Sequence, residues 1–417
     1  VDTLVQSGEL VRERVAGCDG CYLARLHEAE AYTAERLLAM TQTEYRRMPD
    51  TEQIAARIEA QLGLTFADQQ KETLRLACQH QVIAITGGPG TGKTTSIRAI
   101  LALFDVLKLD TQLAAPTGRA AKRMSEVTGE EAKTIHRLLQ VDWDEKDNPV
   151  FTRNERNPLE CDCLVVDELS MVDAYVFESL LRALPFSCRL VLVGDNDQLP
   201  SVGAGNVLGD LIASGLFPTV QLKEIFRQSQ ESLIVMSAHR IVEGKLPDLR
   251  RHDSDFFFLP QEDPQKAAQL IVSLCSVRLP RSYGYSSVTD IQVLCPGRKG
   301  ELGTVELNKH LREAINPSAR GKAEVKVNGA LFRLGDKVMQ IRNDYNLPWA
   351  KEDGTAGEGV FNGDMGVITE IDKPGGAIHV RIDDKDVVYD FERASNELEP
   401  AYAVTVHKSQ GNEFPAV

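Results

Sequence analysis

The stretch VIAITGGPGTGKTTSIRAI, residues 82–100, decides the fold. Its apolar and partly β-branched opening predicts a buried strand, and apolar residues recur at helical spacing after Lys93. Between the two lies the pattern G-x-x-x-x-G-K-T, and a strand, a glycine-rich loop and a helix in that order are the context of a phosphate-binding loop. An ordinary glycine turn before a helix is the alternative. The stretch therefore predicts binding of a nucleoside triphosphate.

The residue types of this loop suit a phosphate chain and its metal ion. Glycines let the backbone turn its N–H groups toward phosphate oxygens, and the start of the following helix adds the positive end of its dipole. The Lys93 ammonium can reach the β- and γ-phosphates, and the Thr94 hydroxyl can ligate Mg²⁺. We assign nucleotide contacts to the loop and the helix start: Gly88, Pro89, Gly90, Thr91, Gly92, Lys93, Thr94 and Thr95.

A second buried strand is predicted to run straight into two adjacent acids. The stretch CDCLVVDELSMVD, residues 161–173, places Asp167 and Glu168 at that strand's carboxyl end. In a protein with a phosphate-binding loop, Asp167 would hold the Mg²⁺ that Thr94 ligates, and Glu168 would orient and deprotonate the attacking water. A turn with two acids and no metal is the alternative.

Three more stretches carry candidate nucleotide contacts. In RLVLVGDNDQLPSVGAG, residues 189–205, Gln198 can sense the γ-phosphate, and in QLKEIFRQ, residues 221–228, Arg227 can stabilise charge on the transferred phosphoryl group. A surface ion-pair arginine is the alternative for Arg227. In FADQQKETLRLA a glutamine ahead of the loop can pair with adenine, or be an ordinary surface side chain.

Other stretches suit nucleic acid. APTGRAAKR places Thr117 and Arg119 between a strand end and a helix, which suits contacts with a phosphate backbone, although a solvated basic helix is the alternative. His136 lies near a helix start, where a lone histidine is more often a capping or packing residue. Alternating apolar residues in 139–158 predict a projecting hairpin, or else a surface loop.

Composition limits the class of protein. The 417 residues carry a net charge of −14, which argues against a uniformly basic nucleic-acid binder, so any DNA contact would be local. No apolar run approaches the roughly 20 residues of a membrane span. We expect no signal peptide and eight reduced cysteines, as in a cytoplasmic protein.

Eight blocks resemble, in order and character, the motifs of the RecD-like DNA helicases of superfamily 1, in the branch that moves 5′ to 3′. The resemblance runs from about Leu64 to the end and favours the stand-alone type related to the exodeoxyribonuclease V alpha subunit. The blocks are GGPGTGKTT, APTGRAAKR, TIHRLL, VVDELSMVD, VGDNDQLPSVGAG, LKEIFRQ, FNGDMG and AYAVTVHKSQGNEF.

This resemblance implies roles for individual residues. Gln70 would read the adenine of ATP, Gln198 would sense the γ-phosphate, and Arg227 would be the first arginine finger. Gly411 and Glu413 would touch the nucleotide from the second motor domain. The positions that hold single-stranded DNA would include Thr117, His136, Thr405, His407 and Lys408. The family's last motif, with a second arginine finger, follows the HKSQG block, so a complete active site is expected to need residues beyond Val417.

The expected fold is α/β, with two RecA-like P-loop NTPase domains, a β-hairpin pin, a small β-barrel insertion and an N-terminal helical segment. The expected boundaries are 1–50 for the helical segment, 51–225 for the first motor domain with its pin at about 140–158, 226–320 with 400–417 for the second, and 321–399 for the barrel.

The expected function is an ATP- and Mg²⁺-dependent DNA helicase of the bacterial cytoplasm, acting as a monomer on single-stranded and forked DNA in repair or recombination, without a membrane. The alternatives are a motor subunit of an ATP-dependent nuclease complex and an ATP-gated DNA-binding switch that does not unwind.

Overall fold

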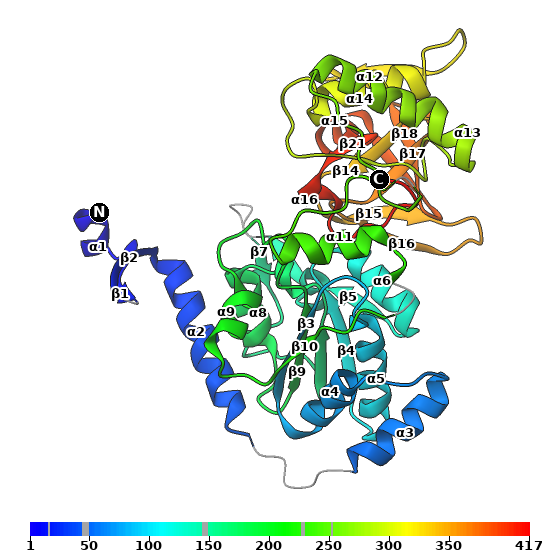
Figure 1. Ribbon diagram of the computed structural model, residues 1–417. Coiled ribbons are helices and arrows are strands. Elements are labelled where there is room, and N and C mark those ends of the chain that lie inside the picture. The colour runs from blue at the N-terminus through cyan, green and yellow to red at the C-terminus, as the bar shows by residue number, and fades with distance from the viewer. Residues whose placement is uncertain (16, 44–49, 144–148, 227–229, 252) are drawn as a thin grey trace. The chain divides into compact units, whose positions relative to one another are not determined.

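The computed structural model describes residues 1–417 apart from 16, 44–49, 144–148, 227–229 and 252 (Figure 1). The chain divides into two compact units. The first comprises Val1–Pro116 and Ala120–Phe258, and the second comprises Thr117–Arg119 and Leu259–Val417. The finer division predicted from the sequence remains a prediction. None of the helices in the described ranges has the length and apolar character needed to cross a bilayer.

A six-stranded parallel sheet forms the centre of the first unit, in the order β10-β3-β9-β8-β4-β5. Its strands read as nearly continuous apolar runs because helices cover both faces. β3, β8 and β9 are buried along almost their whole length, which confirms the strands predicted around the glycine loop and before the paired acids. The strands are β3 (Val82–Gly87), β4 (Thr111–Ala115), β5 (Ala132–Thr134), β8 (Cys163–Val166), β9 (Arg189–Gly194) and β10 (Thr219–Leu222).

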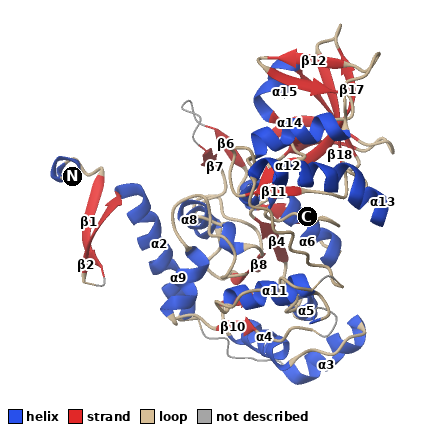
Figure 2. Ribbon diagram, turned by 45° about the horizontal axis from the view of Figure 1, so that its top comes forward, coloured by secondary structure: helices blue, strands red, loops and turns tan. Residues whose placement is uncertain are grey.

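Helices cover both faces of this sheet (Figure 2), and each face carries its own hydrophobic cluster. One packs α2, α8 and α9 against it, and the other packs α3, α4, α5 and α6. The helices that lie wholly or mostly in the first unit are α1 (Asp2–Gln6), α2 (Ala24–Thr41), α3 (Thr51–Leu62), α4 (Asp68–Gln79), α5 (Lys93–Val106), α6 (Gly118–Thr128), α7 (Ile135–Leu138), η1 (Leu169–Met171), α8 (Ala174–Ala183), α9 (Val207–Ser214) and α11 (Leu233–Val242).

The prediction of an all-helical N-terminal segment is wrong for residues 10–23. β1 (Leu10–Val15) and β2 (Cys18–Leu23) form an antiparallel hairpin there. Gly17 adopts a φ of +83° between them, in the left-handed region that a tight turn needs. The leucines at helical spacing that follow the hairpin are in α2.

The hairpin predicted within 139–158 is present. β6 (Val141–Trp143) and β7 (Pro149–Phe151) pair antiparallel, with Val141 opposite Phe151. The turn between them, residues 144–148, lies outside the described residues. The alternation of apolar residues around an Asn-Pro turn signal is therefore a true hairpin pattern, and its role as a pin remains a prediction.

In the second unit, helices surround a short parallel pair formed by β11 (Val293–Cys295) and β21 (Ala403–Thr405). Leu307 and Leu311 of α14 join both strands in one buried cluster. The helical elements are α12 (Pro264–Ser273), η2 (Leu274–Arg278), α13 (Leu279–Tyr283), α14 (Thr304–Ile315) and α16 (Val406–Ser409).

The glycine-broken segment expected to form a small barrel is a separate antiparallel β region. Its seven-stranded sheet has the order β16-β15-β19-β18-β17-β14-β20, and Tyr389 and Phe332 are fully buried in its core. The elements are β12 (Glu324–Val327), β13 (Ala330–Arg333), β14 (Lys337–Gln340), β15 (Asp344–Ala350), β16 (Ala356–Val360), β17 (Met365–Asp372), β18 (Ala377–Ile382), β19 (Lys385–Asp390), α15 (Phe391–Glu397) and β20 (Leu398–Pro400).

Candidate functional site

The glycine loop joins β3 to α5, as the sequence predicts. Gly90 and Gly92 have φ values of +72° and +85°, which other residues adopt only with strain. Thr91 is buried, and its hydroxyl donates to the Gly88 carbonyl at 2.8 Å. These features hold the loop in a tight turn over the start of α5, where its N–H groups can meet an anion.

Lys93, the first residue of α5, turns its ammonium back over this loop. Nζ donates to the Gly87 carbonyl at 2.5 Å and to the Gly88 carbonyl at 3.1 Å. It also lies 3.9 Å from Oδ2 of Asp195, which follows β9 and is 3 % exposed. Because β3 and β9 are parallel neighbours, their carboxyl ends meet at one edge of the sheet. The predicted phosphate ligand thus lies beside an acid that sequence reasoning did not select.

Asp167 and Glu168 directly follow β8, the next strand beyond β9. Burial raises the pKa of both carboxyls, and for Glu168 the neighbouring Asp167 adds to burial and brings the pKa to about 7. Lys93 opposes the rise for both acids. Glu168 also has left-handed backbone angles, φ 54° and ψ 39°, and strained non-glycine residues cluster at functional sites. A carboxyl that titrates near neutral pH suits a proton acceptor.

Gln70 is buried beneath the glycine loop instead of pointing to solvent. Its Oε1 accepts from the Ala67 N–H at 3.0 Å at the start of α4, and its Nε2 donates to the Gly92 carbonyl at 3.4 Å. Its neighbour Gln69 is engaged elsewhere, because Oε1 accepts from the Lys223 N–H at 2.8 Å. Of the two glutamines, Gln70 is therefore the one held against the loop.

Phe226 closes the same place from another part of the chain. Its backbone N–H donates to the Gly90 carbonyl at 3.3 Å. A Cβ added to Gly92 would come within 2.6 Å of the Phe226 ring and 2.7 Å of the Gln70 amide nitrogen. Gly92 thus leaves the space in which Phe226 and Gln70 meet the loop, and Phe226 forms a candidate wall of a base-binding site.

The remaining catalytic candidates differ in what the structure says of them. Gln198 is exposed in the turn after β9, where its N–H donates to the Asp195 carbonyl at 3.2 Å. Arg227 lies outside the described residues. His239 of α11, a residue that sequence reasoning missed, places Nε2 3.0 Å from the Pro89 carbonyl of the loop.

The donors needed for Mg²⁺ are present at this edge of the sheet. Thr94 is exposed in the first turn of α5, and Asp167 is a carboxylate influenced by Lys93. A hydroxyl and a carboxylate oxygen are hard ligands of the kind that Mg²⁺ takes in company with phosphate oxygens. The residues therefore fit the metal.

The predicted DNA contacts in the first half of the chain lie around β4, α6 and α7. Thr117 and Arg119 are partly buried where β4 passes into α6. The His136 ring lies 5.8 Å from the ring of Phe151 in the hairpin, and burial lowers the pKa of His136. His136 therefore packs against the hairpin, as the packing interpretation expects. Its role as a contact for single-stranded DNA remains a prediction.

The predicted contacts near the end of the chain gather on one short element. Thr405 caps α16 by accepting from the Lys408 N–H at 3.4 Å, and Lys408 pairs with Glu399 at 3.2 Å. His407 is exposed on that helix. Gly411 has a φ of +74° just after it, and Glu413 is exposed.

Sequence reasoning missed Asp195, Phe226 and His239 for different reasons. Asp195 follows an apolar strand, which is the signal that selected Asp167, and it could have been found in the same way. Phe226 and His239 carry no local signal, because what brings them to the loop is the path of the chain after β10.

The structure is that of a P-loop nucleotide-binding protein of the RecA-like class. It has a parallel sheet, a glycine loop whose carbonyls accept from a lysine, and acids at the ends of neighbouring strands. An AAA domain model matches residues 70–204, and a model described as the ATP-dependent RecD-like DNA helicase SH3 domain matches residues 307–382. By these matches the chain is RecD-like.

Individual relatives and a solved structure can be compared with this chain. The ATP-dependent RecD2 DNA helicase of Deinococcus radiodurans is 34% identical across 100% of this chain and 54% of its own length. The RecBCD enzyme subunit RecD of Mycolicibacterium smegmatis is 29% identical over 84% of this chain and 65% of its own length. The chain thus spans between about half and two thirds of these relatives. A structure of Bacteroides Pif1 bound to single-stranded DNA aligns with a TM-score of 0.48 and 18% identity, covering 84% of this chain and 85% of that one.

Proposed function

We propose that this protein is an ATP-dependent DNA helicase that moves 5′ to 3′ on single-stranded DNA and separates the duplex ahead of it. The observation that carries the proposal is the convergence on Lys93 of the glycine loop, Asp195 and the paired acids after β8. Such a convergence is the machinery of phosphoryl transfer from ATP. The similarity to proteins described as DNA helicases supports the link to DNA, and the direction of movement rests on the resemblance alone.

In the proposed reaction, Lys93 neutralises charge on the β- and γ-phosphates, and Gln70 and Phe226 hold the base. Thr94 and Asp167 would hold a Mg²⁺ ion, which would supply positive charge to offset that of the phosphates. Glu168 takes the proton of the attacking water, since its pKa of about 7 suits a base at neutral pH. Gln198 senses the γ-phosphate, and Arg227 stabilises the charge that develops during transfer.

Hydrolysis becomes movement only if nucleotide changes the DNA affinity of each unit between states. We assign single-strand contacts to Thr117, Arg119 and His136 in the first half of the chain and to Thr405, His407 and Lys408 near its end. Gly411 and Glu413 are assigned to the nucleotide. The hairpin β6–β7 would be the wedge at the fork.

The test is strand separation by the protein at its full natural length, with ATP and Mg²⁺. Two forked duplexes are compared, one with a 5′ single-stranded tail and one with a 3′ tail. Separation only of the 5′-tailed fork is the expected result. Binding that depends on ATP without separation of either fork would overturn the proposal in favour of an ATP-gated switch.

A second candidate is a motor subunit within a nuclease complex. It is favoured by the similarity to proteins described as RecBCD subunits. Here the protein purified alone would unwind poorly, and unwinding would appear when its natural assembly is isolated by a tag on this chain. Full unwinding by the isolated protein would exclude this candidate.

A further inference from the structure

Helix α8 of the first unit contacts two segments that are far apart in the sequence, namely α2 and the β6–β7 hairpin. On one side it packs against α2, the long helix of the N-terminal segment, and these two helices form one of the more extensive helix–helix contacts of the unit. It also contacts the β6–β7 hairpin and the chain that follows it, through Tyr175 and Arg182. The β6–β7 hairpin is the proposed wedge. Contacts that fix the position of α8 therefore also fix the position of the hairpin.

The first link is a buried carboxylate. Glu178 of α8 is fully buried, and Arg25 of α2 reaches its Oε2 at 2.7 Å. Arg182, one turn further along α8, reaches the other oxygen of Glu178 at 2.8 Å. Arg182 also reaches Glu155, just beyond the hairpin, at 2.7 Å. A fully buried acid needs such partners, because an unpaired buried charge is strongly unfavourable.

The second link is a line of rings and a guanidinium. The Arg25 guanidinium lies 4.6 Å from the centre of the Tyr175 ring in the first turn of α8. The Tyr175 ring lies 6.3 Å from that of Phe151 in β7, and Phe151 lies 5.8 Å from His136. Arg25 therefore connects through two rings to a proposed single-strand contact. On the same helix Tyr32 lies under Arg182 at 3.8 Å.

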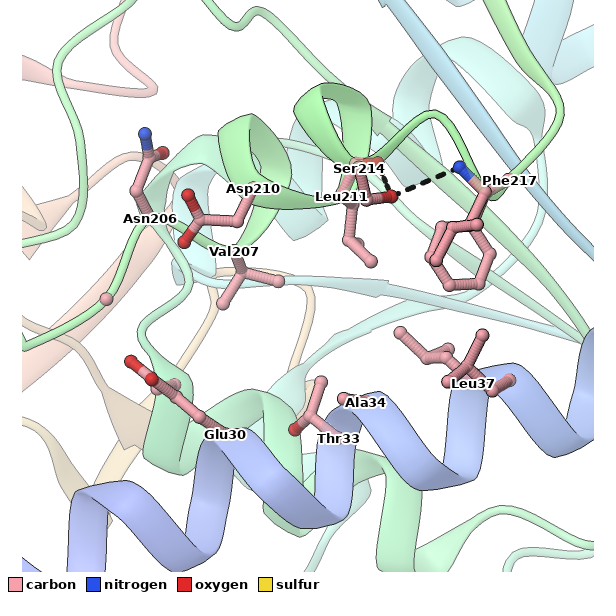
Figure 3. A pocket seen from close by; sticks show the side chains of 14 residues that line it. Glu30, Thr33, Ala34, Leu37, Asn206, Val207, Asp210, Leu211, Ser214 and Phe217 are labelled. Carbon is pink, nitrogen blue, oxygen red and sulfur yellow. Dashed lines mark hydrogen bonds between the residues drawn. The ribbon is translucent and has the colours of Figure 1, made fainter. Parts of the chain in front are cut away.

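α2 is a built part of the unit and not a loosely attached arm. Ala29, Leu37 and Met40 are fully buried, and Leu37 belongs to the same cluster as the sheet and α9. Residues of α2 and α9 line a cavity of about 240 Å³. Figure 3 shows the two helices facing each other across it, with Leu37 on the side opposite Leu211 and Phe217. Arg36 adds a hydrogen bond to the Leu184 carbonyl at 3.0 Å at the end of α8.

We propose that α2 is a brace that positions the β6–β7 hairpin for strand separation, acting through Arg25, Glu178, Tyr175 and Arg182. The inference rests on the proposed function, since it assigns the hairpin a part in unwinding. Arg25 is a positioning residue: it touches neither the nucleotide site nor the hairpin itself. Loosening it should leave ATP turnover intact while the hairpin loses its fixed orientation, so that hydrolysis continues with fewer base pairs opened.

The test is Arg25→Ala in the full-length protein, with two activities measured side by side. ATP hydrolysis stimulated by single-stranded DNA should stay at the wild-type rate. Base pairs opened per ATP on a forked duplex should fall about fivefold, which is what one half-exposed cation–π contact and one ion pair together can supply. Glu178 keeps Arg182 as a partner in this variant, so folding should survive.

Arg12→Ala is the matched control. Arg12 belongs to the same N-terminal segment and pairs with Asp2 at 2.9 Å, but both side chains are exposed and lie outside the contact with α8. Both activities should be unchanged in this variant. Combining Arg25→Ala with Tyr175→Leu should add little to either single change, because residues in one network have non-additive effects.

Hydrogen exchange of residues 149–157 gives a readout that does not depend on unwinding. Arg25→Ala should speed exchange there about fivefold relative to wild type, for the same contact energy. Unchanged exchange, unchanged base pairs per ATP, or a parallel fall in hydrolysis and unwinding would each overturn the brace. Failure of the wild-type protein to open any fork would instead overturn the proposed function.

Discussion

The ammonium of Lys93 lies 3.9 Å from the carboxylate of Asp195. The two residues are about a hundred positions apart in the sequence and meet because β3 pairs with β9. Nζ simultaneously donates to two carbonyls of the loop that it would have to leave in order to reach phosphate oxygens. The lysine is therefore held in place by its own loop and an acid, in a position where phosphate must compete with both.

Replacing Lys93 tests the nucleotide site directly. Lys93→Ala removes the charge that neutralises the β- and γ-phosphates, and we expect ATP hydrolysis and unwinding to fall by at least about 10³-fold, from the loss of transition-state stabilisation. Binding of single-stranded DNA should remain near the wild-type level, since Lys93 is not among the proposed DNA contacts. The measurements are steady-state hydrolysis and a fluorescence-anisotropy titration with an oligonucleotide. Hydrolysis at the wild-type rate would contradict the assignment.

Asp195 is expected to restrain Lys93. Asp195→Asn keeps an oxygen that accepts from the Asp197 N–H but removes the negative charge. Lys93 then loses a competing partner and phosphate no longer meets a nearby carboxylate, so the Kd for ATP should fall about threefold, as for a weak ion pair. The check is a titration with a fluorescent ATP analogue. A rise in the Kd would show instead that Asp195 orients the lysine for binding.

Glu168→Gln should separate catalysis from binding. Without a proton acceptor, turnover should fall about 10²- to 10⁴-fold while ATP still binds. In the wild-type protein, kcat/KM for ATP should decline as pH falls through about 7, because Glu168 must be deprotonated to act as a base and its pKa is about 7. A pH profile that stays flat from 8 to 6 would rule out this role.

Glu168→Gln should stabilise the folded protein, although it lowers the turnover of ATP. The folded-state pKa of Glu168, about 7, lies above the ordinary glutamate value of 4.5, so the charged form of Glu168 opposes folding. That penalty is complete above about pH 7 and disappears as pH falls toward 4.5. At pH 8, Glu168→Gln should therefore raise the free energy of unfolding by about 2–3 kcal/mol. Thermal unfolding at pH 8 and pH 4.5 would measure the gain and its loss.

Gly92 has a geometric requirement that can be isolated with a matched glycine. In Gly92→Ala the new methyl meets the Phe226 ring and the Gln70 amide, on a backbone at φ +85°. In Gly129→Ala the φ is similar, +79°, but nothing lies within 4 Å. Both variants carry the left-handed strain of about 1–2 kcal/mol, and only Gly92→Ala should also weaken ATP binding, by about tenfold or more. Equal loss of ATP binding in both would refute the role given to Gly92.

By itself the sequence determined the parts of this protein that depend on residues close together in the chain. The strand, loop and helix of residues 82–100, the acids after β8 and the alternation of the hairpin each follow from local periodicity and turn chemistry. The N-terminal hairpin was not predicted, because residues 10–15 and 18–23 show no regular alternation of apolar and polar residues and the strong helical pattern of α2 follows them.

Only the tertiary structure decided which distant residues meet. Lys93 meets Asp195, Gln70 meets Phe226 at Gly92, and Arg25 reaches the buried Glu178, each through the packing of whole strands and helices. No local pattern encodes these pairings, because burying the apolar faces of α2, α8 and the sheet sets the position of every side chain they carry. The sequence was enough to predict the chemical groups of the site. The positions of those groups relative to one another follow from the packing of the core.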